Sequence, residues 1–415
     1  MLSPTRRKQK NRDQVCILDL GSHTLRAAVF SCGLDGQPPE VLGVARRSAE
    51  GIGAGAVIDL PALSSCIAAL LEQLEHMADT RVSRVVVVVS HPSIALDRAV
   101  GMASVSGQLV QPKDCRRAEE AARQRFSRRR QRLVHEAVQG YRLDGRSYRE
   151  KPHALKGQRV EVEVQHLSLC EATLNNLVRA VRAAKVQVEA ICSNILATAA
   201  SALSDDERQA GVALLEMGAE TCSSSVYAEG ELIAARCQRG GGRDLTLALS
   251  RGLLVPLKNA EKVKVSSALA LSEMADEQQL VEVETIGLRD RRELPRRAIA
   301  DAIESTLQQQ LQGLASLVSE TGMASQLSAG LVLAGNGAQI EGLVELAERS
   351  LSVPVRVAQP RALVGLAELV DQPGDCALVG AALLWSRNEL PSWESPERRA
   401  RAKRNTQPRW FDLLM

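Results

Sequence analysis

The chain has 415 residues, of which 45% are hydrophobic and 24% charged, and its net charge is +3 at pH 7. These values exclude a disordered or fibrous protein, and the length allows two or more folded domains. No apolar run approaches the ~20 residues of a membrane-spanning helix, and the basic, polar N-terminus lacks the apolar core of a secretory signal, so we expect a cytosolic protein.

The first predicted element is a hairpin at 15–30, VCILDLGSHTLRAAVF. The apolar run from Val15 to Leu20 predicts a buried strand, Gly21-Ser22 permits a tight turn, and a second strand follows. Backbone N–H groups and hydroxyls at the tip would suit phosphate oxygens, and Asp19 would face them as an acceptor for hydrated Mg²⁺. Taken alone, the pattern is explained equally well by a hairpin that binds nothing.

A strand near Glu40–Arg46, a helix over Leu60–Met77 and a strand over Val82–Ser90 come next, and the VVVVV run of the last indicates burial on both faces. From about His91 to Leu169 the pattern changes to short alternating strands and one charged helix, so we expect an inserted α/β module. Its expected elements are strands at Ala99–Leu109, Gln131–Val138 and Gln158–Gln165 and a helix at Asp114–Arg130.

After this module we expect a helix at Cys170–Ala184, a strand at Val186–Ile191 and an Ala-rich crossover helix at Ile195–Leu203. A second strand–turn–strand at 211–232 then repeats the layout of the first hairpin. It is followed by Gly240-Gly241-Gly242, helices at Asp244–Arg251 and around 260–264, a short strand near Leu280–Glu284 and a long helix at Arg296–Glu320.

A strand then ends in Gly335-Asn336-Gly337, where we expect a helix to start at once and to present its N-terminus to a ligand. An Ala-rich helix at Gly374–Leu390 is the last predicted element of the folded part. Nine cysteines occur singly and six histidines show no ligand spacing, which argues against a disulfide or zinc framework.

Two similar hairpins followed by a strand–Gly-x-Gly–helix segment form the order found in the actin, sugar-kinase and heat-shock ATPase superfamily. Within it, the chain resembles the FtsA family, the actin-like bacterial division proteins that attach the FtsZ ring to the membrane. The segments similar to motifs of that family are EGIGAGAVIDLPAL (50–63), HEAVQGYRLDG (135–145) with GQRVEVEVQ (157–165), and RGLLVPLKNAEKVKV (251–265). The resemblance runs from about Gln14 to Arg387, and the short C-terminal tail also fits the pattern of the family.

The fold class that the resemblance implies is α/β, with two related domains around a nucleotide cleft and an inserted FtsA-type subdomain. The expected division is a basic tail at 1–13, the core of domain 1 at 14–90, the inserted subdomain at 91–169, a return to domain 1 with the crossover helix at 170–205, domain 2 at 206–373, a final helix on domain 1 at 374–390, a linker at 391–404 and an amphipathic helix at 405–415.

The resemblance also implies a site for ATP and Mg²⁺ between the two domains. Asp19 would hold the Mg²⁺ through water. The residues implied around the nucleotide are Gly21, Ser22, His23, Thr24, Gly218 and Thr221 at the phosphates, Gly240, Gly241 and Gly242 beneath them, Glu261 at the ribose, Lys264 along the adenine, and Gly335, Asn336 and Gly337 below the nucleotide. Without the resemblance, Glu261 and Lys264 would belong to a plain surface helix.

Departures from the family pattern predict that ATP is bound weakly and hydrolysed poorly, so that the protein is at most a weak ATPase. The second hairpin reads EMGAET (216–221) where the family has D-x-G-G-G-T, so Ala219 adds a methyl group and Glu220 brings a carboxylate toward the triphosphate. The Ser-Asn pair at 193–194 replaces a Glu-Pro whose carboxylate would orient an attacking water, and His23 replaces a small hydroxyl residue.

The C-terminal segment NTQPRWFDLLM (405–415) follows a basic linker, and Pro408 suits the first turn of a helix. Such a helix can lie in an anionic membrane interface. The residues expected to bind the membrane are Arg409, Trp410, Phe411, Leu413, Leu414 and Met415. A frayed terminus, or a tail docked on its own domain, is the alternative.

The resemblance therefore predicts a division protein that forms actin-like polymers on the cytoplasmic face of the inner membrane at the division site. It would anchor FtsZ filaments and recruit later division proteins. Two alternatives remain on the same fold: the actin-like cytoplasmic protein of a type IV pilus machine, and an active ATPase or sugar kinase. Basic clusters at 6–12, 123–132 and 398–409 suggest nucleic acid, but aromatic residues make up only 2% and no nucleic-acid module is recognisable, so we expect no such partner.

Overall fold

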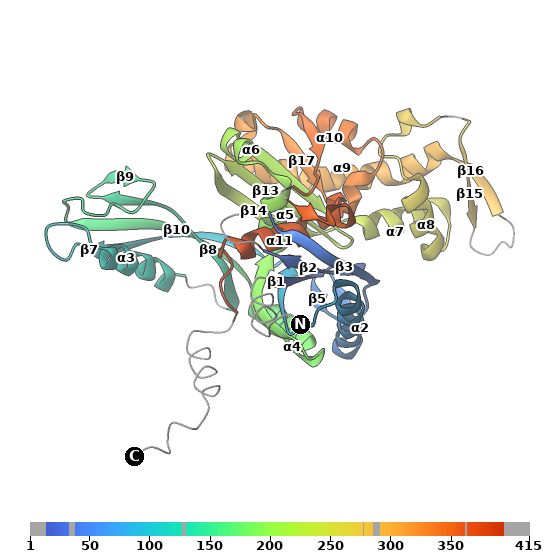
Figure 1. Cartoon of the computed structure of the whole chain (residues 1–415). Coiled ribbons are helices and arrows are strands. Elements are labelled where there is room, and N and C mark those ends of the chain that lie inside the picture. The colour runs from blue at the N-terminus through green and yellow to red at the C-terminus, as the bar shows by residue number, and fades with distance from the viewer. Residues whose placement is uncertain are drawn as a thin grey trace, which may run out of the picture.

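The computed structural model describes residues 14–32, 38–126, 130–276, 278–284, 291–361 and 363–393. Two mixed sheets form the centres of two lobes, and a third sheet with one helix reaches out from lobe 1 (Figure 1). None of the helices in this described part combines the length and the apolar composition that a bilayer crossing requires.

Lobe 1 is built on a six-stranded sheet with the order β11-β6-β1-β2-β3-β19. Its strands are β1 (Gln14–Leu20), β2 (Thr24–Ser31), β3 (Glu40–Ser48), β6 (Arg84–Val89), β11 (Gln187–Ser193) and β19 (Val364–Gly365), and a small hairpin of β4 (Ile52–Gly53) and β5 (Ala56–Val57) follows β3. The alternate residues of β1 enter two different cores because both faces of this sheet are covered. Helices α2 (Leu60–Ala78) and α4 (Glu171–Ala183) cover one face, and α5 (Asn194–Ala202) and α11 (Cys376–Ser386) cover the other.

The inserted subdomain carries a four-stranded sheet with the order β7-β10-β8-β9. Its elements are β7 (Ala95–Ser104), α3 (Pro112–Gln124), β8 (Gln131–Leu143), β9 (Arg146–Tyr148) and β10 (Arg159–Cys170). Small buried residues of α3, among them Ala118 and Ala122, let this helix lie close on the sheet, and a Cβ at Gly101 of β7 would lie 2.0 Å from the Ala118 carbonyl oxygen. The subdomain therefore has its own small core.

Lobe 2 is built on a five-stranded sheet with the order β14-β13-β12-β17-β18. Its strands are β12 (Val212–Met217), β13 (Thr221–Ala228), β14 (Glu231–Arg239), β17 (Leu331–Ala334) and β18 (Val355–Val357), and its helices are α6 (Asp205–Ala210), α7 (Gly242–Leu253), α8 (Leu257–Ser267), α9 (Arg296–Thr321) and α10 (Leu343–Leu351). The hairpin of β15 (Leu280–Glu284) and β16 (Arg291–Pro295) lies at the far end of this lobe (Figure 1).

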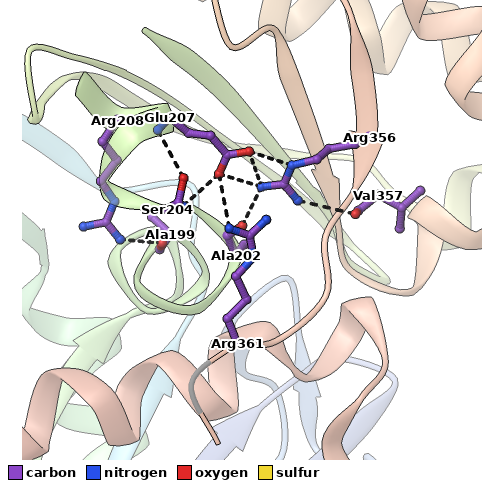
Figure 2. A network of polar contacts seen from close by, with 8 residues as sticks. All are labelled: Ala199, Ala202, Ser204, Glu207, Arg208, Arg356, Val357 and Arg361. Atoms are coloured by element: carbon purple, nitrogen blue, oxygen red, sulfur yellow. Dashed lines mark hydrogen bonds and ion pairs between the residues drawn. The ribbon is translucent and has the colours of Figure 1, made fainter. Parts of the chain in front are cut away.

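Helix α5 passes between the two sheets, and its small residues allow close packing. A Cβ at Gly380 of α11 would lie 1.7 Å from the Ala197 carbonyl oxygen of α5, so only glycine fits there. Figure 2 shows the polar network at the end of this crossover. The Glu207 carboxylate accepts two hydrogen bonds from Arg356 of β18, each 2.7 Å, and one of 2.8 Å from the Ser204 backbone N–H. This network ties the crossover between the lobes to the edge strand of lobe 2.

Several predicted bounds need correction. The charged helix expected at Asp114–Arg130 ends at Gln124, and a 3-10 turn, Asn336–Gln339, takes the place of the α-helix expected to start directly after Gly335-Asn336-Gly337. Helix α10 begins only at Leu343, because Gly335 and Gly342 both have positive φ angles, 79° and 77°, which interrupt the helical path.

The expected linker at 391–404 starts with a packed segment. The Trp393 backbone N–H donates to the Glu189 carbonyl oxygen, and the Arg132 guanidinium carbon lies 3.4 Å from the centre of the Trp393 ring. The remaining linker and the predicted membrane helix, 394–415, lie outside the described residues.

Candidate functional site

A cleft of about 960 Å³ lies between the two lobes. The tips of the β1–β2 and β12–β13 hairpins, the first turn of α7, one side of α8 and the turns at 335–339 and 373–375 surround it. It brings together most of the predicted nucleotide residues, namely Asp19, Gly21, Ser22, His23, Thr24, Gly218, Thr221, Gly242, Glu261, Lys264, Gly335, Asn336 and Gly337.

Gly240 and Gly241 were expected beneath the phosphates but do not line the cleft. They shape the turn into α7, with φ angles of 147° and 113°, and a Cβ at Gly241 would lie 2.3 Å from the Gly218 carbonyl oxygen. The Gly242 backbone N–H donates to that same oxygen at 2.9 Å, and the Arg243 N–H donates to the next carbonyl of the hairpin. The first N–H groups of α7 are thus already bonded to the hairpin instead of facing the cleft.

Asp19 faces an arginine at the end of the cleft where the phosphates were expected. Its Oδ2 lies 3.3 Å from Arg26 Nη1, and Arg26 Nε lies 3.5 Å from Oδ1 of the buried Asp375. Arg46 Nη2 lies 2.8 Å from the other oxygen of Asp375. Burial raises the pKa of Asp19, and the Arg26 guanidinium opposes that rise. Each of the two carboxylates therefore has a guanidinium as its counterion.

This arrangement does not fit the Mg²⁺ expected at Asp19. Mg²⁺ is usually held by one or two carboxylates together with waters and substrate phosphates, whereas the Asp19 carboxylate contacts a positive guanidinium. An added divalent ion would lie close to that charge and be repelled by it. The described residues contain no cluster of three or more His, Cys, Asp or Glu side chains that could hold a metal.

Glu216 and Asn194 form a second polar pair at the bottom of the cleft. Asn194 Nδ2 donates to Glu216 Oε2 and, at 3.0 Å, to Ser223 Oγ. Burial and the nearby Asp19 carboxylate raise the pKa of Glu216 to about 7. The carboxylate that the family resemblance implied at position 193 is replaced by the buried Ser193, and neither its hydroxyl nor the neighbouring Asn194 amide can take a proton from water at neutral pH.

Glu220 lines the cleft, and its carboxylate reaches lobe 1. Its Oε2 accepts a hydrogen bond of 2.8 Å from the Ala54 backbone N–H, and its Oε1 lies 3.3 Å from Arg243 Nε. Beside this contact, the hydroxyls of Ser90 and Thr221 are 2.9 Å apart. The two lobes are thus joined by side chains of the second hairpin.

At the other end of the cleft, Glu261 and Lys264 bind one another instead of standing free. Lys264 Nζ donates to Glu261 Oε2 at 2.6 Å and to the Gly242 carbonyl oxygen at 2.9 Å, so it points at the turn into α7, and its place along an adenine stays a prediction. Burial raises the pKa of Glu261, but the hydrogen bonds from Lys264 and Thr246 outweigh this and bring it below its usual value. The ribose contact of Glu261 stays a prediction.

Comparison with known proteins shows to which family the chain belongs. The model of the cell division protein FtsA matches residues 213–380, and the model of the SHS2 domain inserted in FtsA matches residues 92–168. The cell division protein FtsA of Agrobacterium fabrum is 30% identical over 330 residues, which cover 79% of this chain and 74% of that protein. The chain belongs to the FtsA family. The FtsA of Escherichia coli K12 is 28% identical over 95% of this chain and 96% of its own length.

Solved structures confirm the predicted actin-like fold class. The type IV pilus biogenesis complex PilM–PilN gives a TM-score of 0.61 at 20% identity over 89% of this chain and 97% of the other. MreB 5 of Spiroplasma citri bound to AMPPNP gives 0.55 at 12% identity over 95% and 99%. At these identities the likeness shows the fold alone, with the SHS2 insertion as the feature that belongs to FtsA proteins.

Sequence reasoning missed Arg26, Arg46 and Asp375 as members of the cleft. Two signals were available: Arg26 is a charged residue within the apolar run of β2, and Asp375 comes directly before α11, the most apolar of the described helices. Neither signal showed that the two would meet, because they are distant in sequence. The predicted membrane-binding residues lie outside the described part of the chain.

Proposed function

We propose that this FtsA-family chain assembles into actin-like polymers on the cytoplasmic face of the cell membrane at the division site. There it anchors FtsZ filaments and recruits later division proteins. The observation that supports this proposal is the family relationship, which covers both the actin-like lobes and the inserted SHS2 domain.

The proposed anchor is the segment 405–415, with Trp410 and Phe411 in its apolar face. A large apolar side chain contributes at most about 1.5–3 kcal/mol when fully buried, and burial in a membrane interface is partial. Ordering a short helix opposes this gain. One tail therefore binds weakly and reversibly, whereas a row of tails on a polymer binds firmly through effective concentration.

We further propose that ATP enters the cleft between the lobes but is bound weakly and hydrolysed poorly. The support is chemical. Ser193 stands in place of the expected carboxylate base, and the neighbouring Asn194 offers only an amide. Asp19 is already paired with Arg26. Polymer assembly and membrane attachment then require no ATP turnover.

Co-sedimentation with liposomes that contain anionic lipid tests the anchor. We compare the full chain with a form that ends at Arg404 and with the double variant Trp410→Ser/Phe411→Ser. The matched control, Asn405→Ser/Gln407→Ser, changes two polar residues of the same segment. We expect pelleting of the full chain and of the control only.

Addition of FtsZ filaments to the same assay tests the proposal that the chain anchors FtsZ to the membrane. FtsZ should pellet with the liposomes only when the full chain or the control variant is present. Equal pelleting of the full chain and the truncated form would overturn the anchoring proposal.

A further inference from the structure

We propose that Arg26 supplies the positive charge at the phosphate end of the cleft, so that ATP binds there without Mg²⁺. This inference rests on the proposed function only in that ATP enters the cleft. It starts from the observation that the residues around Asp19 do not fit a magnesium ion.

The sheet itself places the charges. Asp19 of β1 lies directly opposite Arg26 of β2, and Arg26 lies directly opposite Arg46 of β3. Directly opposed residues of neighbouring strands have their Cβ atoms about 4.5–5.5 Å apart on one face of the sheet. Asp19, Arg26 and Arg46 therefore form a row across the sheet that is fixed by backbone pairing. Because the row runs across three paired strands, Arg26 is held beside Asp19 by the fold.

Asp375 completes the row. It lies between the two arginines, with Oδ1 at 3.5 Å from Arg26 Nε and Oδ2 at 2.8 Å from Arg46 Nη2. Two guanidinium groups thus face two carboxylates, and each carboxylate has a guanidinium as its counterion. The carboxylates therefore need no metal ion to neutralise them.

The same arginines are suited to phosphate. Both line the cleft together with the Gly21–Thr24 turn. A guanidinium carries five N–H donors in a planar fork, binds phosphate through paired hydrogen bonds, and stays charged at all ordinary pH values. A phosphate group entering beside the turn meets this fork, whereas a Mg²⁺ ion accompanying it meets a like charge.

Titration calorimetry of the full chain with ATP tests the inference, once in EDTA and once in excess Mg²⁺. We expect the two dissociation constants to agree within about threefold. A dissociation constant that is more than about tenfold weaker in EDTA would overturn the inference, and so would the absence of binding in both buffers.

Three variants sharpen the test. Arg26→Gln removes the charge and should weaken binding in EDTA by about tenfold or more, with Mg²⁺ now restoring part of it. Arg26→Lys keeps the charge and should bind equally in both buffers, which covers the case in which the glutamine variant fails to fold. Arg47→Gln is the matched control, because Arg47 is the exposed neighbour of Arg46 and does not line the cleft. Unchanged binding of Arg26→Gln in EDTA would overturn the inference.

Liposome pelleting in the same two buffers separates this inference from the proposed function. Pelleting without any ATP binding would leave membrane anchoring intact and overturn both the entry of ATP and the role of Arg26, whereas ATP binding in Mg²⁺ but not in EDTA would overturn the role of Arg26 alone. Loss of pelleting with ATP binding intact would overturn membrane anchoring and leave the role of Arg26 standing.

Discussion

Oε2 of Glu220 accepts a hydrogen bond of 2.8 Å from the backbone N–H of Ala54, and this bond joins the second hairpin of lobe 2 to the small β4–β5 hairpin of lobe 1. A Cβ at the neighbouring Gly53 would lie only 3.1 Å from the same carboxylate oxygen, so the contact is tightly packed. The sequence alone suggested that Glu220 would repel a triphosphate. In the folded chain its carboxylate joins the two lobes, and the repulsion of a triphosphate stays a prediction.

Replacing Glu220 by alanine should loosen this contact between the lobes. The Ala54 N–H loses its acceptor, so we expect its hydrogen exchange, and that of the 51–58 segment around it, to become faster by about tenfold. Hydrogen exchange read by mass spectrometry measures this. Glu293→Ala, on the distant hairpin of lobe 2, is the control and should leave the segment unchanged. Equal protection of 51–58 in both variants would show that Glu220 does not hold the lobes together.

Glu216 should make the protein less stable as the pH rises. Its pKa is raised from 4.5 to about 7 in the folded chain, so the folded state binds the proton more tightly than the unfolded state does. The stabilisation from this group is complete below about pH 4.5, falls as the pH rises toward 7, and is lost above it, with a total on the order of 3 kcal/mol.

Urea unfolding of the wild type and of Glu216→Gln, measured from pH 5 to pH 8, isolates this contribution. Glutamine keeps an acceptor for Asn194 but does not titrate. We expect the difference in unfolding free energy to shift steadily in favour of the variant as the pH rises. A difference that stays constant across this range would refute the assignment.

The fold was largely predictable from the sequence because its signals are local. The apolar run of β1, the glycine turns and the helical spacing of α2 each depend on a few neighbouring residues. The bounds of β15 at Leu280–Glu284 were predicted as observed. The start of α10 was not, because the left-handed glycines at 335 and 342 insert a 3-10 turn that the spacing of apolar residues does not reveal.

The cleft was predictable in its lining but not in its charge pairing. The hairpin tips carry recognisable glycine and hydroxyl patterns, whereas the meeting of Arg26 with Asp375 joins residues more than 300 positions apart. A charged side chain in a strand gives no sign of its partner until strand order and helix placement are known. For the same reason, the direction taken by Glu220 could not be read from its neighbours.

The polar network of Glu207 should stabilise the crossover between the lobes more than an exposed ion pair elsewhere does. Glu207 accepts from both Nε and Nη2 of Arg356 and caps α6 through Ser204. Glu207→Gln should therefore lower the free energy of unfolding by about 1–3 kcal/mol. The control is Glu320→Gln, which breaks an exposed pair with Arg236 and should cost less than about 1 kcal/mol. Equal losses in chemical denaturation would contradict the role of this network.

The last prediction concerns ATP turnover. Asn194 cannot act as a base, Glu216 is bound to Asn194, and Asp19 is paired with Arg26. We therefore expect phosphate release at saturating ATP to be equally slow in the wild type and in Asn194→Ala, with Mg²⁺ or with EDTA.

Asn194→Ala also removes the hydrogen bond to Glu216, so its folding is checked by thermal unfolding before the comparison. Ser201→Ala, on the same helix but bonded to the Cys376 carbonyl oxygen away from the cleft, is the matched control. Steady turnover by the wild type that Asn194→Ala abolishes and Ser201→Ala keeps would show that the amide positions the attacking water. In that case the cleft would be a working ATPase site, and the polymer would have to be treated as one driven by hydrolysis.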